Sequence, residues 1–202
     1  MEGSDGCGKS TIAQLLVDRL NQNSIPAIFT YQPGDTNYGV LATIFRSLCK
    51  DKRWNIHALS NMYAFYIDRI EQMDKVIIPA LAEGKTVVSD RWWYSTYAYQ
   101  YFGKEIMKTY NMPQSVAEWF SVSSELGHHP DVVYYFPEKI VKPAETRKSD
   151  SGQNDIFETA GRSFEERVHN AYEGLAQNLD FKVVWPTPTP QETLERLIDI
   201  DF

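Results

Sequence analysis

The chain has 202 residues and a formal net charge of −7, from 20 lysines and arginines against 27 aspartates and glutamates. With 43% hydrophobic and 23% charged residues it can build a buried core, so we expect one folded domain and not a disordered segment. The acidic balance argues against a broad nucleic-acid-binding surface, which needs clustered positive charge. Two cysteines cannot form a disulfide framework and favour a reducing cytoplasm. No apolar stretch approaches the roughly 20 residues of a membrane span, and we see no signal peptide.

Helices and strands are expected to alternate along the chain. Helices are predicted where apolar residues recur at helical spacing, over residues 9–20, 59–73, 164–179 and 191–198. Buried strands are predicted in short runs of β-branched and aromatic residues, over residues 27–31, 86–89, 131–136 and 182–185. The alternation indicates an α/β fold with a mainly parallel sheet. Residues 138–161 are polar and lack periodicity, which predicts a mobile lid.

A glycine-rich motif opens the chain. The run GSDGCGKS from Gly3 to Ser10 matches the full Gly-x-x-x-x-Gly-Lys-Ser/Thr pattern. Glycines at positions 3, 6 and 8 let backbone N–H groups point at phosphate oxygens, and the helix that follows adds its positive N-terminal end. Lys9 can reach the β- and γ-phosphates, the Ser10 hydroxyl can ligate Mg²⁺, and Thr11 supplies a second hydroxyl. An empty glycine-rich turn is the alternative, but the amphipathic helix directly behind it favours a nucleoside triphosphate site.

Three further features indicate which kind of molecule accepts the phosphate. Asp90 ends a predicted strand, where a carboxylate can hold Mg²⁺ through water, and Arg91 can stabilise the transferring phosphoryl group; a strand-end ion pair is the alternative. Phe65 and Arg69 lie one helical turn apart and suit a flat base with a carbonyl edge, although their spacing alone favours a core Phe beside a surface Arg. Asp5 lies inside the phosphate loop, where its charge repels phosphate unless it accepts from a sugar hydroxyl.

Together these segments resemble the thymidylate kinase family over nearly the whole chain. Residues 2–11 are similar to its Glu-Gly-x-Asp-Gly-x-Gly-Lys-Ser-Thr opening. Residues 90–100 are similar to its Asp-Arg-aromatic and Ser-x-x-Ala-Tyr-Gln segment, and residues 164–172 to the helix after its lid. The resemblance implies a three-layer P-loop kinase fold over residues 1–202. It also implies Mg²⁺ and ATP as cofactors, dTMP as a small-molecule partner and a homodimer, with no nucleic acid or membrane partner.

The resemblance also implies roles for individual residues of the acceptor site. Asp5 would bind the 3′-hydroxyl of the deoxyribose. Phe65 would stack on the pyrimidine and Arg69 would meet its O4. Thr96 would touch the base edge, and Tyr99 would crowd the 2′ position and so favour deoxyribose.

Two segments depart from the family pattern. Where the family usually carries Arg-Glu-Pro-Gly-Gly, residues 31–35 read Tyr-Gln-Pro-Gly-Asp, which affects the acceptor-phosphate contacts and the base preference. Arg46 could substitute for the missing arginine. The lid motif Asp-Arg-x-Glu reads Asp-Ile-Phe-Glu at residues 155–158, so the transition-state cation would come from Arg147 or Lys148.

The sequence therefore favours an ATP- and Mg²⁺-dependent kinase for a deoxypyrimidine monophosphate, most simply dTMP. A kinase for a modified dUMP derivative is the nearest alternative, because residues 31 and 32 differ from the family. A non-catalytic nucleotide-binding sensor is the alternative of another class. The aromatic residues between 92 and 102 are expected to form core or a dimer face, and His128-His129 a turn.

The chain is short at one place in the expected sheet. In this architecture a buried strand feeds directly into the phosphate loop and lies in the middle of the sheet. Only Met1 and Glu2 precede Gly3, so we expect the central strand to be missing together with an upstream segment of about 8 residues. The alternative is that another segment fills the gap.

Overall fold

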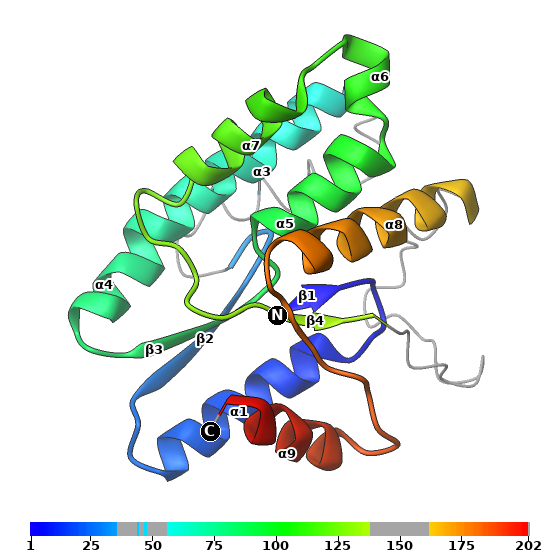
Figure 1. The fold of residues 1–202 in the computed structure, drawn as a ribbon. Helices are drawn as coiled ribbons and strands as arrows, with labels where there is room; N and C mark the ends of the chain where they lie inside the picture. Colours follow the sequence, from blue (N-terminus) through cyan, green and yellow to red (C-terminus); the bar gives the residue numbers. More distant parts are fainter. Residues whose placement is uncertain (36–43, 45–46, 48–55, 138–161, 202) are drawn as a thin grey trace.

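The computed structural model describes residues 1–35, 44, 47, 56–137 and 162–201 (Figure 1). Its strands within these residues are β1 (Glu2–Gly3), β2 (Ala27–Tyr31), β3 (Thr86–Asp90), β4 (Tyr134–Phe136) and β5 (Lys182–Val183). β2 pairs with β3, and β4 pairs with β1 on one side and β5 on the other, all in parallel.

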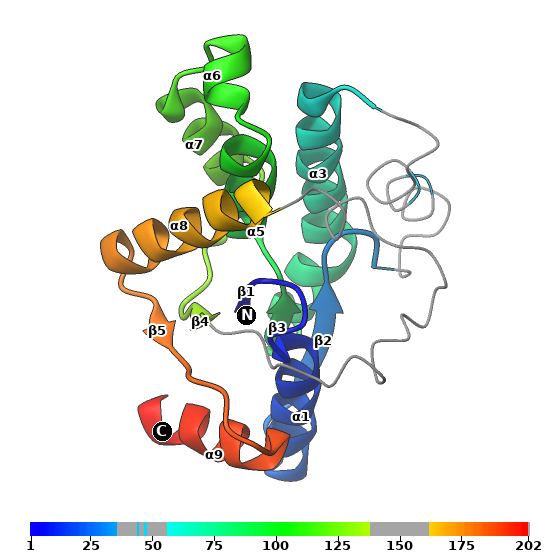
Figure 2. The same ribbon diagram turned by 90° about the vertical axis from the view of Figure 1, so that its right-hand side faces the viewer.

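Met1 connects the two groups of strands. Its backbone nitrogen donates to the Ser89 carbonyl (2.9 Å), and its carbonyl accepts from the Arg91 N–H (2.9 Å). This alternation around Asp90 is the hydrogen-bond pattern of a parallel pair. The strands therefore follow the order β2-β3-β1-β4-β5, as Figure 2 shows from one edge to the other. The phosphate loop leaves the sheet at its middle strand.

Helices cover both faces of this sheet (Figure 1). One face carries α1 (Lys9–Gln22) and α9 (Pro190–Asp201). The other face carries the remaining helices: α3 (Ala58–Gln72), α4 (Ile78–Ala82), α5 (Trp93–Thr96), α6 (Ile106–Tyr110), α7 (Gln114–Ser123) and α8 (Arg162–Asn178), with π-helical turns η3 (Met73–Ile77) and η4 (Tyr97–Gly103). The parallel sheet between two helical layers has the architecture of a P-loop kinase, as expected.

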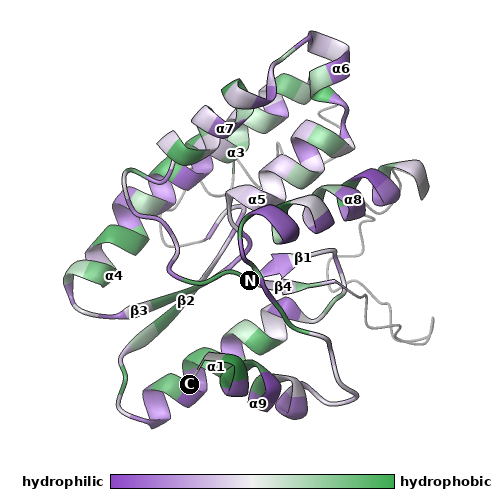
Figure 3. Ribbon diagram, in the orientation of Figure 1, coloured by the Kyte–Doolittle hydropathy of each residue, from purple (hydrophilic) through white to green (hydrophobic). Residues whose placement is uncertain are grey.

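Each face of the sheet has its own hydrophobic core. On the α1 side, Ile12 and Leu16 pack with Leu197 of α9. The other core is aromatic, and in it the Tyr97 and Tyr101 rings of η4 stack with centroids 5.2 Å apart. In Figure 3, hydrophobic residues follow β2 and β3, whereas hydrophilic residues are frequent along α8. The aromatic run from residue 92 to 102 is thus mainly core.

The predicted elements lie close to their expected positions, with two corrections. The helix over 9–20 and the strand over 27–31 correspond to α1 and β2. The strands expected over 131–136 and 182–185 are shorter: β4 pairs with β1 at residues 135 and 136 and with β5 at residues 134 and 135, and the pairing extends no further. The helices between residues 93 and 123 were not predicted. The expected lid, 138–161, lies outside the described residues.

The expectation that the central strand is missing is also corrected. Glu2 pairs with Tyr135 and Gly3 with Phe136, so the central position is occupied by a strand of two residues. The expected upstream segment stays a prediction. Among the residues described, no helix combines the length and apolarity needed to span a bilayer.

Candidate functional site

The phosphate loop connects β1 to α1 and contains residues 4–8. Gly6 and Gly8 have φ values of 80° and 89°, in the left-handed region that glycine adopts without a steric penalty. Gly3 has a different requirement: a Cβ there would lie 2.5 Å from the Phe136 carbonyl oxygen of the neighbouring strand. The Lys9 side chain is 4% exposed and its ammonium donates to the Ser4 carbonyl (3.1 Å). The Lys9 side chain therefore lies against the curled backbone of the loop.

Ser10 and Asp90 meet where α1 begins and β3 ends. The Ser10 hydroxyl donates to Oδ2 of Asp90. Oδ1 of this buried carboxylate has no hydrogen-bond partner within the described part of the chain. A hydroxyl beside a carboxylate is a donor set that suits Mg²⁺, which is commonly held by one or two protein oxygens together with substrate phosphates. In the same described part, no group of three or more His, Cys, Asp or Glu side chains could hold a metal.

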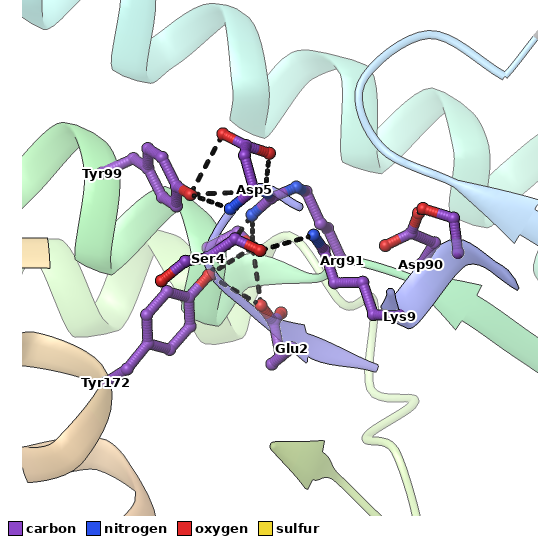
Figure 4. A network of polar contacts seen from close by, with 10 residues as sticks. Glu2, Ser4, Asp5, Lys9, Asp90, Arg91, Tyr99 and Tyr172 are labelled. Carbon is purple, nitrogen blue, oxygen red and sulfur yellow. Dashed lines mark hydrogen bonds and ion pairs between the residues drawn. The ribbon is translucent and has the colours of Figure 1, made fainter. Parts of the chain in front are cut away.

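Asp5 and Arg91 form an ion pair above the loop (Figure 4). Arg91 follows β3 with a φ of 71°, and its guanidinium lies 4.9 Å from the centre of the Tyr99 ring. The Tyr99 hydroxyl donates to the Asp5 carboxylate (3.2 Å) and accepts from the Asp5 N–H (3.2 Å). These three residues come from the loop, from the end of β3 and from η4, so the tertiary fold assembles them.

Glu2 lies beneath this group and is fully buried (Figure 4). Its carboxylate accepts from the Trp92 N–H (2.6 Å), the Ser95 hydroxyl (2.6 Å) and the Tyr172 hydroxyl (3.0 Å). Ser95 in turn accepts from Nη1 of Arg91 (2.9 Å). Glu2, on the central strand, therefore supports Arg91 through Ser95. Its bond to Tyr172 connects the same network to α8.

The ion pair shifts the pKa values of both Asp5 and Arg91. Burial raises the pKa of Asp5, but the positive charges of Arg91 and Lys9 outweigh it and lower the pKa to about 2. Burial lowers the pKa of Arg91, but the Asp5 carboxylate more than reverses this and the pKa is raised. Asp5 is therefore an anion and an acceptor at neutral pH.

Arg69 is the centre of a second polar group, which we call the Arg69 cluster: Gln32, Arg69, Thr96 and Ser124. Its guanidinium is fully buried and donates from Nε to Gln32 Oε1 (3.1 Å), from Nη1 to Ser124 (3.2 Å) and from Nη2 to Thr96 (2.8 Å). Burial lowers its pKa to about 10, so Arg69 keeps its charge at neutral pH. The idea of a surface arginine at this position is therefore wrong.

The turn after β2 is hydrogen-bonded to side chains of α3. The Gln72 carboxamide donates to the Thr30 hydroxyl (2.5 Å) and to the Tyr31 carbonyl (3.1 Å). The Gly34 N–H donates to the Asp68 carboxylate (3.1 Å). Residues 68 and 72 flank Arg69 along the helix, so the contacts that hold the turn also place Gln32 against Arg69.

Comparison with known proteins gives a consistent result. A family model for thymidylate kinase matches residues 1–198. The chain belongs to the thymidylate kinase family. Curated thymidylate kinases from Chlorobium chlorochromatii and Fervidobacterium nodosum are 36% and 31% identical to it, over 98% of the chain and 90% and 95% of their own lengths. A solved thymidylate kinase from Ehrlichia chaffeensis has the same fold, with a TM-score of 0.73 at 22% identity, covering 98% of this chain and 95% of that one.

Family membership makes the chain a nucleoside monophosphate kinase, which is a phosphotransferase. The structure places most of the residues singled out from sequence in two groups. Lys9, Ser10 and Asp90 lie with the Asp5–Arg91 pair, and Tyr99 joins them. Arg69 lies one helical turn after Phe65 on α3 and is in direct contact with Thr96 of α5. Phe65 is buried beside Ala64, apart from the two main cores. Arg46 and Arg147 lie outside the described residues.

Sequence reasoning gave no role to several residues that support the site. Glu2 appears in the sequence only as the residue before the glycine motif, and Ser95 and Tyr172 only as parts of longer matches. Gln32 appears only as a departure from the family. The charge of Glu2 could have indicated its role, because a carboxylate in a central strand must find buried hydrogen-bond donors.

Proposed function

We propose that this kinase transfers the γ-phosphate of ATP to dTMP, giving ADP and dTDP, in a Mg²⁺-dependent reaction. The observation that supports this most is the meeting of Ser10–Asp90 and Asp5–Arg91 at one end of the parallel strands. Ligands of open α/β sheets bind at the carboxyl ends of the strands. The thymidylate kinases of Chlorobium chlorochromatii and Fervidobacterium nodosum supply the choice of dTMP.

The phosphate loop is the proposed site for ATP. Backbone N–H groups around Gly3, Gly6 and Gly8 would cradle its phosphates, together with the Thr11 hydroxyl and the charge of Lys9. Ser10 and Asp90 would hold Mg²⁺, which would neutralise charge on the β- and γ-phosphate oxygens. Oδ1 of Asp90, which has no hydrogen-bond partner among the described residues, fits this assignment.

The Asp5–Arg91 group and the Arg69 cluster are the proposed site for dTMP. The Asp5 carboxylate would accept from the 3′-hydroxyl, and Tyr99 would exclude a 2′-hydroxyl. Arg69 and Thr96 would contact the base edge, with Phe65 stacked on the ring. The support for this placement is that each set comes together in the tertiary structure from distant segments.

The reaction requires positioning and charge neutralisation more than covalent chemistry by the protein. An oxygen of the dTMP phosphate forms a bond to the γ-phosphorus, and the bond from that phosphorus to the β–γ bridging oxygen breaks. Lys9 and Arg91 would stabilise the charge on the transferring group. Arg147, from the predicted lid over residues 138–161, is the proposed additional cation.

A coupled ADP-release assay over dTMP, dUMP, dCMP, dGMP and thymidine tests the proposal. We expect the highest kcat/KM with dTMP and no turnover without Mg²⁺. Turnover of thymidine but of no monophosphate would refute it. Binding of both substrates by calorimetry without phosphate transfer would instead favour a nucleotide sensor.

A kinase for a modified dUMP derivative is the second candidate. The observation that favours it is Gln32, which replaces the family's usual glutamate beside Arg69. A 5-substituted dUMP with a higher kcat/KM than dTMP in the same assay would support this candidate.

Three further inferences accompany the proposal. We infer that residues 1–202 act as one domain, that two copies form a homodimer, and that the enzyme works in the cytoplasm on small nucleotides. Sedimentation of the purified chain at several concentrations tests the dimer.

A further inference from the structure

Arg91 has an unusual backbone conformation, and hydrogen bonds hold it on both sides. Its φ of 71° lies in the left-handed region, which residues other than glycine rarely adopt. The Arg91 N–H donates to the Met1 carbonyl (2.9 Å), and the Arg91 carbonyl accepts from the Ser89 hydroxyl (2.8 Å). The next N–H, that of Trp92, donates to Oε1 of Glu2 (2.6 Å). A strained backbone persists only where its surroundings over-determine it, and Glu2 supplies one of these contacts.

The Arg91 side chain depends on the same carboxylate. Its Nη1 donates to the Ser95 hydroxyl (2.9 Å) and, at the longer distance of 3.4 Å, to the Tyr172 hydroxyl. Oε2 of Glu2 lies 2.6 Å from the Ser95 hydroxyl and 3.0 Å from the Tyr172 hydroxyl. Within the described residues Arg91 forms its ion pair with Asp5, above it in Figure 4, whereas Glu2 reaches it from below through the two hydroxyls.

The direction of these two hydroxyls follows from their partners. A guanidinium can only donate, and a hydroxyl has a single hydrogen to give. Ser95 and Tyr172 therefore turn lone pairs toward Arg91 and direct their hydrogens elsewhere. The hydroxyls also lie 2.7 Å apart, and whichever of them donates to the other, the chain of hydrogens ends at Oε2 of Glu2. The carboxylate thus makes both hydroxyls acceptors for Nη1.

We propose that Glu2 is a positioning residue for phosphoryl transfer, which holds Arg91 by its backbone and by its guanidinium so that the charge faces the transferred phosphate. This inference rests on the proposed function, in which Arg91 stabilises that group. Glu2 is fully buried, so its effect on the reaction passes through Arg91. The effect is large because a stabilising charge acts fully only when it is preorganised, and a small displacement slows the reaction strongly.

A purely structural role for Glu2 is the competing explanation. A buried carboxylate with three donors satisfies the central strand whether or not Arg91 takes part in the reaction. Tyr135 separates the two explanations. Its ring stacks on Tyr172 with centroids 5.6 Å apart, and its hydroxyl likewise donates to a carboxylate, that of Glu173 (3.0 Å). Loss of the Tyr135 hydroxyl therefore imitates the loss of the Tyr172 hydroxyl in packing, but it leaves the contacts of Arg91 in place.

Tyr172→Phe is the first variant, because it removes one hydroxyl and keeps the ring. We expect kcat with dTMP to fall about 3- to 10-fold, with KM for ATP changed less than about 2-fold, since the lost bond acts in the transition state and not in nucleotide binding. Tyr135→Phe is the matched control and should keep the kcat of the parent enzyme.

Glu2→Gln is the sharper variant, because it keeps the shape of the side chain. If the carboxamide oxygen stays with the Trp92 N–H, the NH₂ group donates to the hydroxyls and turns their hydrogens toward Arg91. If the carboxamide flips, the NH₂ group faces the Trp92 N–H instead. Each orientation places a donor against a donor, and we expect kcat to fall about 10-fold or more with little change in KM for ATP.

A double-mutant cycle separates positioning of Arg91 from a general loss of stability. Arg91→Lys removes the planar guanidinium that the hydroxyls hold, so in this background Tyr172→Phe should lower kcat by less than about 2-fold further. Thermal unfolding of each variant shows that it is folded. The cycle on Tyr172 alone decides the question if Glu2→Gln does not fold.

An unchanged kcat in folded Glu2→Gln and Tyr172→Phe would overturn the inference. Equal losses of kcat in Tyr172→Phe and Tyr135→Phe would also overturn it, as would the same Tyr172→Phe loss with and without Arg91→Lys; Glu2 would then have a structural role only. A parent enzyme that does not phosphorylate dTMP would refute the proposed function itself, before any variant is compared.

Discussion

Asp5 and Arg91 are 86 residues apart in the chain, yet they form an ion pair directly above the phosphate loop. Arg91 has a left-handed backbone at the end of β3, and the Tyr99 hydroxyl donates to the same Asp5 carboxylate that Arg91 contacts. The pair joins the loop proposed to bind ATP to the group proposed to bind the acceptor sugar. Its chemistry leads to the first two predictions.

Asp5→Asn should impair the use of a 3′-hydroxyl. We expect kcat/KM for dTMP to fall about 10- to 100-fold, because a charge-assisted hydrogen bond becomes a neutral one. The 3′-deoxy analogue of dTMP should lose far less, since it cannot make this bond in either enzyme. Equal losses for both nucleotides in the ADP-release assay would show that Asp5 acts through Arg91 and not on the sugar.

The same pair should make stability depend on acid pH. The pKa of Asp5 is lowered from 3.8 to about 2 in the fold, so its ionised form stabilises the native state above pH 3.8. That contribution should disappear as the pH falls from about 4 to about 2. The difference in melting temperature between the parent and Asp5→Asn should therefore narrow over this window. A constant difference would contradict the shifted pKa.

Asp90→Asn should weaken the response to Mg²⁺. The substitution removes the charge of the carboxylate that accepts from Ser10. We expect the Mg²⁺ concentration for half-maximal activity to rise about 10-fold or more, and kcat to fall. Asp131→Asn, at an exposed position before β4, is the control and should leave the Mg²⁺ titration unchanged. Identical Mg²⁺ titrations for Asp90→Asn and the parent would remove Asp90 from the metal site.

Two substitutions in the glycine motif should differ in their effect on folding. Gly3→Ala would place a Cβ 2.5 Å from a backbone oxygen of β4, and we expect it to lower the free energy of unfolding by more than about 3 kcal/mol. A Cβ added at Gly6 would have no atom within 4 Å. Gly6→Ala should therefore lower the free energy of unfolding only by the strain of its left-handed backbone, about 1–2 kcal/mol. Urea denaturation measures both, and equal losses would contradict the close contact at Gly3.

Local patterns in the sequence were enough to predict several parts of the structure. The glycine motif from Gly3 to Ser10 consists of consecutive residues, so it can be recognised in the sequence without knowledge of the fold. The helix at 9–20 and the strand at 27–31 were predicted because apolar periodicity is a local property. The family pattern extended this to Asp90 and Arg91.

Other features depend on contacts between distant segments. β4 is three residues long because it pairs with two residues of β1 and two of β5, which the apolar run over 131–136 does not reveal. The helical spacing of Phe65 and Arg69 is compatible with a surface arginine, but packing against Trp92 and Tyr66 buries Arg69 completely.

The sequence by itself therefore determined the phosphate loop, the alternating helices and strands, and the kinase family, because each is written in neighbouring residues. The tertiary structure decided which side chains share a buried environment. Only there does the Gln32 carboxamide meet Arg69, and only there do the donors Ser95 and Tyr172 reach Glu2. The physical reason is that burial and hydrogen-bond satisfaction are properties of neighbours in space and not of neighbours along the chain.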